Sequence, residues 1–222
     1  MLTARVKALL GLIGLLGLLG LGVLAKTRPM TRHDLHVDRR VAEFRFPVAT
    51  DLALSATAAA SEVIGIALLL IGVIALVIRG RRWDAARLMM AVGGAWTLGL
   101  VVKAAIERGR PPASLWLLAP DSANSFPSGH DTTACAMILV AALVFRGAGR
   151  ARLVAVLLAA AYAVAVGGSR IYLGDHYPTD VVGSWLTVTT AALLVWAATD
   201  LAIARRLGFR LLRDPRLQPQ LA

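Results

Sequence analysis

Two histidines and an aspartate in the second half of the chain could carry out group transfer. His176 and Asp180 are four residues apart, which is neighbour spacing on a helix, and Pro178 suits the first turn of that helix. A carboxylate that accepts a hydrogen bond from one imidazole nitrogen fixes the tautomer and makes the other nitrogen a better nucleophile. His130 is a second imidazole, which could act as a general acid. The three side chains therefore offer a nucleophile, its orienting carboxylate and a proton donor.

Three basic side chains and one helix start could bind a multiply charged anion. Lys103 and Arg110 are seven residues apart and would share a face if a helix persists that far. Ser128 is well placed as the N-cap of a helix starting at Gly129, whose free backbone N–H groups attract anions. Arg170 would join them from a later loop. These groups favour phosphate, and their charge could replace that of a metal in phosphoryl transfer.

The same residues allow other interpretations. A metal site built from His130, His176 and Asp180 is the sharpest rival, but three adjacent cations would repel the metal. We therefore expect neither a metal nor a cofactor. The cations could also be simple charges at helix ends whose long side chains reach water, an interpretation that suits Arg108 well.

Neighbouring polar residues have simpler explanations. Asp131 follows Ser128 by three residues, the spacing of a capping box, and we interpret it as a helix cap. Asp175 is interpreted as a polar loop residue. Cys135 is the only cysteine, so an internal disulfide and a cysteine metal cluster are excluded, and we predict that it is a small core residue.

The composition is that of a membrane protein. Of the 222 residues, 58% are hydrophobic, and the mean hydropathy is +0.70, too apolar for an ordinary soluble domain. A net charge of +11 would suggest nucleic acid in a soluble protein. Here the arginines flank apolar runs and aromatic residues are not interleaved with them, so we expect membrane-flanking charges and no nucleic-acid partner.

The apolar runs predict an all-α polytopic membrane protein with six transmembrane helices in one bundle, joined by short loops. Residues 1–222 would form a single membrane-embedded domain, with a core at 52–204 and a basic interfacial helix at 205–222. We expect the first span to be uncleaved, and its glycines would let another helix pack closely. The spans are predicted at 6–25, 52–78, 88–106, 128–145, 153–168 and from about 178 to 204.

Two features fit this plan less directly. The polar segment 26–50 contains His33, Asp34, His36 and Asp38, but its mixed charge favours a solvated loop or interfacial helix over a metal site. Glu62 falls inside the second span, where an acid is a candidate for function or for helix packing.

Counting the spans brings the charged segments together. No span separates Lys103 and Arg110 from His130, and two spans separate His130 from Arg170, so all lie at one end of the bundle. The basic loops at 79–87 and 146–152 should be cytoplasmic, which places the charged segments on the periplasmic or extracellular side. The basic segment 26–45 would also lie outside, which is contrary to the rule that basic segments stay on the cytoplasmic side.

These segments resemble the type 2 phosphatidic acid phosphatase superfamily. Its signature is Lys, six residues, Arg-Pro; then Pro-Ser-Gly-His; then Ser-Arg, five residues, His, three residues, Asp. Residue type, spacing and order all match, at Lys103…Arg110-Pro111, Pro127-Ser128-Gly129-His130 and Ser169-Arg170…His176…Asp180.

The resemblance implies a mechanism. His176 would attack phosphorus and form a phospho-histidine, Asp180 would orient it, and His130 would protonate the leaving oxygen and then activate water. The phosphoryl oxygens would be held by Lys103, Arg110, Ser128, Gly129 and Arg170.

The resemblance also implies a bacterial cell-membrane enzyme whose substrate enters from the bilayer. Family members act on undecaprenyl diphosphate, phosphatidylglycerol phosphate, phosphatidic acid or lipid A phosphates, and a polyprenyl diphosphate is slightly favoured here. A lipid phosphotransferase on the same scaffold, and a non-catalytic membrane transporter or scaffold, are the alternatives. The sequence leaves the lipid and the oligomeric state open.

Overall fold

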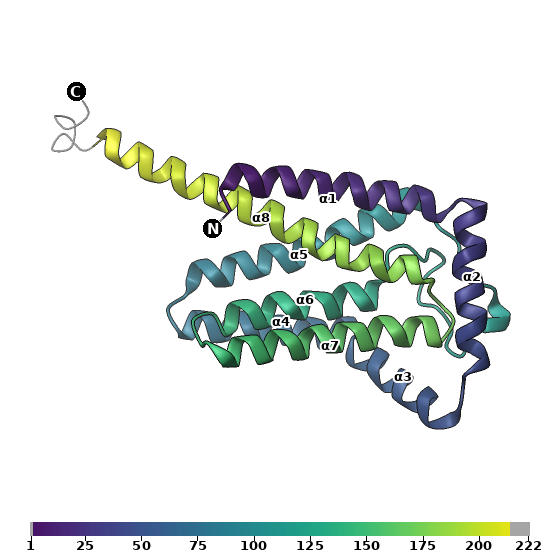
Figure 1. Cartoon of the computed structure of the whole chain (residues 1–222). Coiled ribbons are helices and arrows are strands. Elements are labelled where there is room, and N and C mark those ends of the chain that lie inside the picture. The colour runs from purple at the N-terminus through teal and green to yellow at the C-terminus, as the bar shows by residue number, and fades with distance from the viewer. Residues whose placement is uncertain (1, 214–222) are drawn as a thin grey trace.

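The computed structural model describes residues 2–213 and the side chains of residues 2–203. Over that range it is almost entirely helical, without strands, so the all-α prediction is confirmed (Figure 1). The elements are α1 (Ala4–Ala25), α2 (Arg28–Glu43), α3 (Pro47–Ala59), α4 (Glu62–Ile78), α5 (Arg82–Ile106), the short 3-10 helix η1 (Ala113–Leu115), α6 (Gly129–Val144), α7 (Arg150–Tyr172) and α8 (Pro178–Arg213).

Several helices can cross a membrane. By length and composition α1, α5, α7 and residues 178–203 of α8 qualify, and α3 with α4 forms a fifth candidate. α6 is apolar but has only 16 residues. A multi-pass membrane protein is thus confirmed, while the count of six stays a prediction.

The second span predicted over 52–78 contains a break that the sequence analysis did not predict. α3 ends at Ala59, α4 starts at Glu62, and the two helices are bent by 53°. Glu62 is exposed in the first turn of α4, at the positive end of the helix dipole, rather than buried within a span.

Close packing of the first helix was predicted from its glycines and is confirmed for part of them. α1 packs along α8, and a Cβ atom at Gly14 would lie only 2.5 Å from Thr190 Oγ1. Gly11 similarly faces Leu194 of α8. Gly17 and Gly20 face open space and take no part in this contact.

The main core lies where α4, α5, α6, α7 and α8 meet. Leu88, Val92, Cys135 and Val166 are buried there, so the prediction for Cys135 is confirmed. Large apolar side chains on the outer faces of α1, α4 and α7 are instead exposed, as expected where a helix faces lipid.

α2 lies across one end of the bundle, nearly perpendicular to the other helices (Figure 1). Its inner face buries Asp34 and Asp38, whereas His33 and His36 are exposed. An interfacial helix was one of the two predictions for this segment. The acids on its inner face were not predicted.

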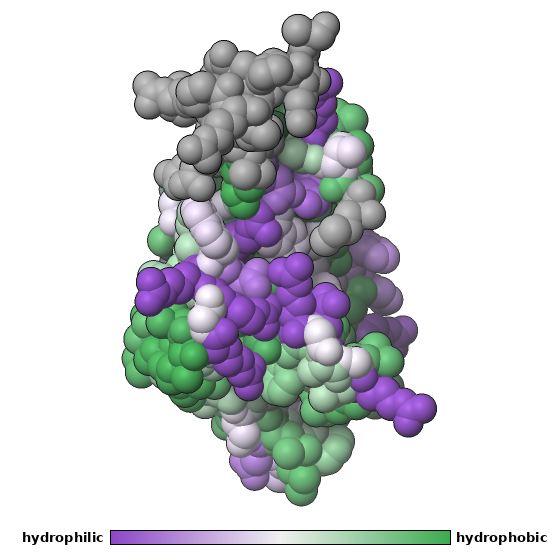
Figure 2. Space-filling view, turned by 90° about the vertical axis from the view of Figure 1, so that its left-hand side faces the viewer, coloured by the Kyte–Doolittle hydropathy of each residue, from purple (hydrophilic) through white to green (hydrophobic). Residues whose placement is uncertain are grey.

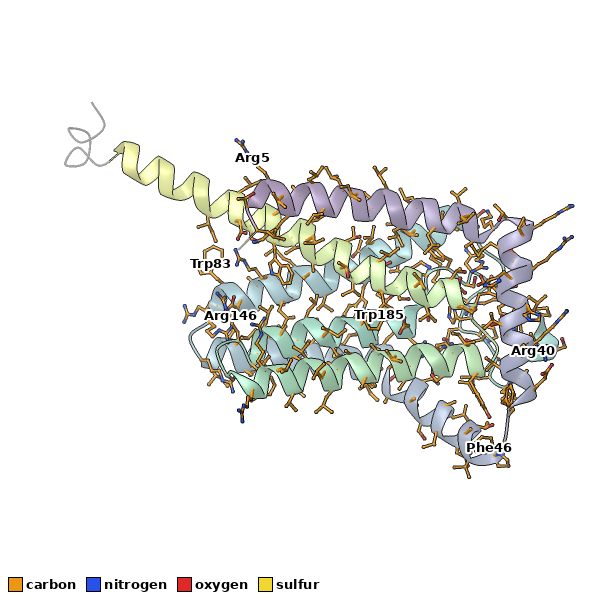
Figure 3. The ribbon with its side chains drawn as sticks, in the orientation of Figure 1. Arg5, Arg40, Phe46, Trp83, Arg146 and Trp185 are labelled. Atoms are coloured by element: carbon orange, nitrogen blue, oxygen red, sulfur yellow. The ribbon has the colours of Figure 1, made fainter. Side chains whose placement is uncertain are left out.

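The predicted tail helix is wrong over residues 205–213, because α8 runs on without a break to Arg213. The remainder of the predicted tail, 214–222, lies outside the described residues. Figure 3 shows the two ends of the bundle: Arg40 and Phe46 lie at the α2 end, and Arg5, Trp83 and Arg146 lie at the opposite end.

Candidate active site

The predicted pair of His176 and Asp180 forms where the chain passes from α7 to α8. His176 Nδ1 lies 3.2 Å from Asp180 Oδ2, and both residues are buried. The turn before them needs glycine: Gly174 has φ +81° and packs so tightly that a Cβ would lie 2.1 Å from Leu115 O. The pair is therefore fixed by a tight turn on one side and by the first turn of α8 on the other.

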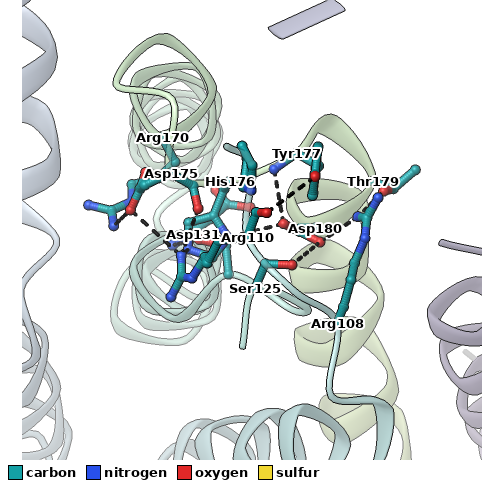
Figure 4. Close-up of polar contacts among 12 residues, drawn as sticks. Arg108, Arg110, Ser125, Asp131, Arg170, Asp175, His176, Tyr177, Thr179 and Asp180 are labelled. Carbon is teal, nitrogen blue, oxygen red and sulfur yellow. Dashed lines mark hydrogen bonds and ion pairs between the residues drawn. The ribbon is translucent and has the colours of Figure 1, made fainter. Parts of the chain in front are cut away.

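The tautomer of His176 follows from its other neighbour. Arg110 Nη1 lies 2.7 Å from His176 Nε2, and a guanidinium can only donate. Nε2 must then carry the lone pair, and Nδ1 carries the proton that is directed at Asp180 (Figure 4). Burial lowers the pKa of His176, and the charge of Arg110 lowers it further. The ring is therefore neutral near pH 7, as a nucleophile requires.

Both carboxylate oxygens of Asp180 are fully used. Oδ2 accepts from His176 and from the backbone N–H of Tyr177 at 2.9 Å. Oδ1 accepts from Arg108 Nη1 at 2.7 Å and from Ser125 Oγ at 3.3 Å. Four donors hold this carboxylate in one orientation.

Arg108 is the residue that the sequence interpretation placed wrongly. It is buried, not extended to water, and its Nη2 donates to Asp34 Oδ2 at 2.6 Å. Its guanidinium lies 4.1 Å from the centre of the Tyr177 ring. Arg108 therefore links α2 to Asp180.

Arg170 and Asp175 form a second buried pair. Arg170 Nη2 binds Asp175 Oδ2, and Arg170 Nη1 donates to Thr57 Oγ1 of α3 at 2.6 Å. Arg110 Nη1 lies 3.7 Å from the same Asp175 oxygen. Asp175 lies in a loop as predicted, but it is buried between two arginines, which the sequence analysis did not predict.

Lys103 and Arg110 arrive by different routes. α5 ends at Ile106, and Glu107 adopts a left-handed conformation with φ 51°, so the helical face predicted for the two cations does not exist. Arg110 reaches His176 from the loop, where its Nε donates to Ser122 O at 3.0 Å.

Lys103 lies beside the same loop. Its Nζ donates to the carbonyl oxygens of Asn124 at 3.0 Å and Ser125 at 3.3 Å. Because the Ser125 hydroxyl also donates to Asp180, Ser125 connects Lys103 to the pair of Asp180 and His176.

The start of α6 differs in detail from the prediction. Ser128 is the N-cap, with its Oγ accepting from Asp131 N at 3.5 Å. Its own backbone N–H donates to Asp180 O at 3.3 Å, so the Asp131 carboxylate does not complete a capping box. The Gly129 amide, in the first turn of α6, has no acceptor within the helix, and no heavy atom lies within 4 Å of the point that a Cβ would occupy at Gly129.

Asp121, which the sequence analysis did not single out, joins His130 to the arginines. Its Oδ2 lies 3.6 Å from His130 Nδ1 and 3.8 Å from Arg170 Nη2. This exposed carboxylate marks a position where one anion can touch both groups. His130, Arg170, Arg110 and His176 thus line a continuous polar site.

The donor set does not resemble a metal centre. Within residues 2–203 no three His, Cys, Asp or Glu side chains are grouped to hold one metal ion. On α2, the two histidines and the two aspartates face opposite ways.

An apolar groove lies in the membrane region next to this site. It has a volume of about 270 Å³ and is lined by α6 and α8, with Cys135 and Trp185 at the end nearer the active site. Cys135 follows His130 by five residues and Trp185 follows Asp180 by five. The groove therefore starts about 7.5 Å along the helices from His130 and Asp180, toward the middle of the bundle. α7 packs along α6 but scarcely touches α8, which leaves the groove open.

The comparison with known families agrees with this geometry. The model of the PAP2 superfamily matches residues 84–203, more than half of the chain. The chain belongs to the PAP2 superfamily. All eight predicted site residues of this PAP2 protein fall inside the matched segment, whereas Asp34 and Thr57 lie outside it.

Named relatives of this PAP2 chain are membrane lipid phosphatases. It is 36% identical over 111 residues to phosphatidylglycerophosphatase B of Bacillus subtilis (47% of this chain, 53% of the relative). It is 34% identical over 122 residues to lipid A 1-phosphatase of Rhizobium johnstonii (49% and 47%). The matches thus span about half the length of these curated relatives.

Two crystal structures share the fold. A transmembrane PAP2-type phosphatidylglycerolphosphate phosphatase from Bacillus subtilis aligns with a TM-score of 0.76 at 25% identity, covering 86% of this chain and 96% of that one. Aquifex aeolicus LpxE aligns with a TM-score of 0.54 at 23% identity, covering 73% and 93%.

The residues that sequence reasoning missed had one weak signal. Asp34 and Asp38 are four apart in a helix otherwise rich in arginine, so they share a face that the basic residues avoid. A buried acid pair on a basic helix implies a buried cation nearby, which is Arg108.

Proposed function

We propose that this protein is an integral-membrane lipid phosphatase that works through a phospho-histidine at His176, without a metal. The observation that carries the proposal is the His176 ring, held by Asp180 at Nδ1 and facing an arginine at Nε2. A neutral imidazole whose Nε2 lone pair is directed at cationic side chains is suited to attack a phosphoryl group that those side chains bind.

In the first step, Arg110 turns from His176 Nε2 to the phosphoryl oxygens, and Nε2 attacks phosphorus. A P–N bond forms and the P–O bond to the lipid breaks. His130 donates its proton to the leaving oxygen. The Nδ1 proton stays on His176, so the phosphorylated ring is cationic, and Asp180 stabilises that charge.

In the second step, His130 removes a proton from water, and the oxygen of that water attacks phosphorus. The P–N bond breaks, inorganic phosphate leaves, and His176 is neutral again. Throughout, Lys103, Arg110, Arg170 and the Gly129 amide neutralise the phosphoryl oxygens, and the Ser128 hydroxyl adds a donor.

The groove between α6 and α8 supports a lipid substrate over a soluble one. It runs from Trp185 to Trp196, which are 11 residues apart and thus about 16 Å along the helix. That length suits a hydrocarbon chain whose phosphate lies beside His130 and His176. The names of the relatives point the same way, toward a lipid carrying a phosphate or diphosphate.

We place the enzyme in a bacterial cell membrane with the site on the periplasmic or extracellular side. Arg146 lies at the end of the bundle opposite to α2 (Figure 3), and Arg79 donates to Val144 O beside the same turn. The positive-inside rule favours the cytoplasm for this basic end.

The test is a panel of lipid phosphates and diphosphates offered to the purified protein in detergent. We expect release of inorganic phosphate, inhibition by vanadate, and no inhibition by EDTA. Transfer of the phosphoryl group to a second lipid would instead identify a phosphotransferase. Loss of activity with EDTA, restored by a divalent metal, would refute the metal-free mechanism.

A further inference from the structure

Helix α2, outside the segment that matches the family, reaches the catalytic pair through one buried arginine. Asp34 and Arg108 are both almost completely buried, and their ion pair is 2.6 Å long. The other arm of the same guanidinium lies 2.7 Å from Asp180 Oδ1. The opposite oxygen of Asp180 holds His176. Four side chains therefore connect α2 to the reacting nitrogen.

Further contacts make this connection rigid. Thr179 Oγ1 donates to Asp34 Oδ2 and accepts from Arg108 Nη1. The Tyr177 ring covers the guanidinium face. Because Arg108 is fixed on its edge and its face, it can hold Asp180 in only one position.

The charges in this connection also matter. A buried arginine that faced Asp180 alone would draw that carboxylate's charge away from His176. Asp34 shares the charge of Arg108, so Asp180 remains a strong hydrogen-bond acceptor for the Nδ1 proton. A strong acceptor makes Nε2 more nucleophilic and stabilises the cationic phosphorylated ring.

We propose that Asp34 is a positioning residue for the reaction: through Arg108 it fixes Asp180 and keeps that carboxylate a strong partner for His176. This inference rests on the proposed function for its kinetic part. Asp34 lies behind Arg108, away from the reacting nitrogen, so it acts on the chemical step and not on binding.

The test compares Asp34→Asn with Asp38→Asn. The two acids lie on the same face of α2, one turn apart, and are equally buried, but Asp38 has no hydrogen-bond partner among the side chains that the structure describes. We expect kcat of Asp34→Asn to fall about 10- to 100-fold with KM nearly unchanged, the size of one charge-assisted hydrogen bond. Asp38→Asn should keep the wild-type kcat.

A double-mutant cycle separates positioning from general damage. If Asp34 acts through Arg108, then adding Asp34→Asn to Arg108→Gln should cause no further loss of kcat. Independent, multiplying losses would overturn the proposal, and so would a wild-type kcat in Asp34→Asn.

A readout that does not need turnover keeps this inference separate from the proposed function. The chain has only four histidines, so ¹⁵N-histidine labelling of the whole protein gives a simple NMR spectrum. Asp34→Asn should weaken the bond from His176 Nδ1 to Asp180 and move that proton to higher field, while Asp38→Asn leaves it in place. An unmoved resonance would refute the inference even in an active enzyme. A shifted one would support it even if no lipid phosphate in the panel is hydrolysed.

Discussion

Each end of the bundle holds one charged side chain between two of opposite sign, but the two clusters differ in how deeply they are buried. At the α2 end, Arg108 lies between Asp34 and Asp180, whose side chains are 1% and 0% exposed. At the opposite end, Asp200 lies between Lys7 and Arg87 and is 27% exposed. Figure 2 views that opposite end, where hydrophilic residues gather between apolar sides.

The difference in burial changes what each cluster can do. The ion pairs of Asp200 are only partly buried, and pairs close to solvent stabilise a protein by about 0–1 kcal/mol each, so Asp200 serves mainly to join α1, α5 and α8. Burying a charge is unfavourable and is only offset by well-formed partners. The α2 end therefore gains orientation from its ion pairs more than it gains stability, and that is where chemistry needs fixed groups.

The largest expected effect comes from removing the nucleophile. His176→Ala should lower phosphate release by about 10⁴-fold or more, because no other group can form the covalent intermediate. The measurement is phosphate release by the purified protein, with His33→Ala, on the exposed face of α2, as the control. Normal membrane insertion of His176→Ala together with near-normal activity would contradict the proposed mechanism.

A second, smaller effect compares the two ends directly. Arg108→Gln should lower kcat about 100-fold and destabilise the protein by about 3–5 kcal/mol, because Asp34 and Asp180 lose their shared cation in a buried site. Arg87→Gln should leave kcat unchanged and destabilise by less than about 1 kcal/mol, since Asp200 keeps Lys7. Kinetics and thermal unfolding in detergent measure both. Equal effects at the two ends would remove the distinction between them.

The sequence allowed the convergence of the site to be predicted because its groups lie in short segments whose membrane side follows from counting spans. His176 with Asp180, and Ser128 as N-cap, depend only on neighbouring residues. Such local relations hold whatever the arrangement of the other helices.

The parts that failed depend on contacts far apart in the sequence, or on breaks without a usual signal. The interpretation of Arg108 failed because only the placement of α2 across the bundle end buries it. The break after Ala59, for example, contains neither proline nor glycine. Over 205–213 the helix continues because arginine and leucine favour a helix as much as an interface.

A third test asks whether the groove between α6 and α8, next to the active site, receives the lipid chain. Thr189 is an exposed residue that lines the groove, and Thr189→Trp would fill it from the open side. We expect kcat/KM for long-chain lipid phosphates to fall about 10-fold, while a short-chain soluble substrate is unaffected. Leu158→Trp, exposed on α7 away from the groove, is the control. An equal loss on both chain lengths would argue against a tail in the groove.

The smallest effect on turnover separates two acids of the same helix. Burial, followed by repulsion from Asp34 and Asp180, raises the pKa of Asp38 to about 8. The folded protein then binds a proton there that the unfolded chain releases near pH 4, so the contribution of Asp38 to stability is full below pH 4 and is lost as pH rises toward 8. Asp38→Asn should remove that fall, on the order of a few kcal/mol at pH 8, without changing kcat. Melting temperatures in detergent from pH 4 to 9 measure it. A lower melting temperature for Asp38→Asn at pH 8 would mean that the carboxylate is ionised and paired, and that α2 contributes two working acids to this end of the bundle instead of one.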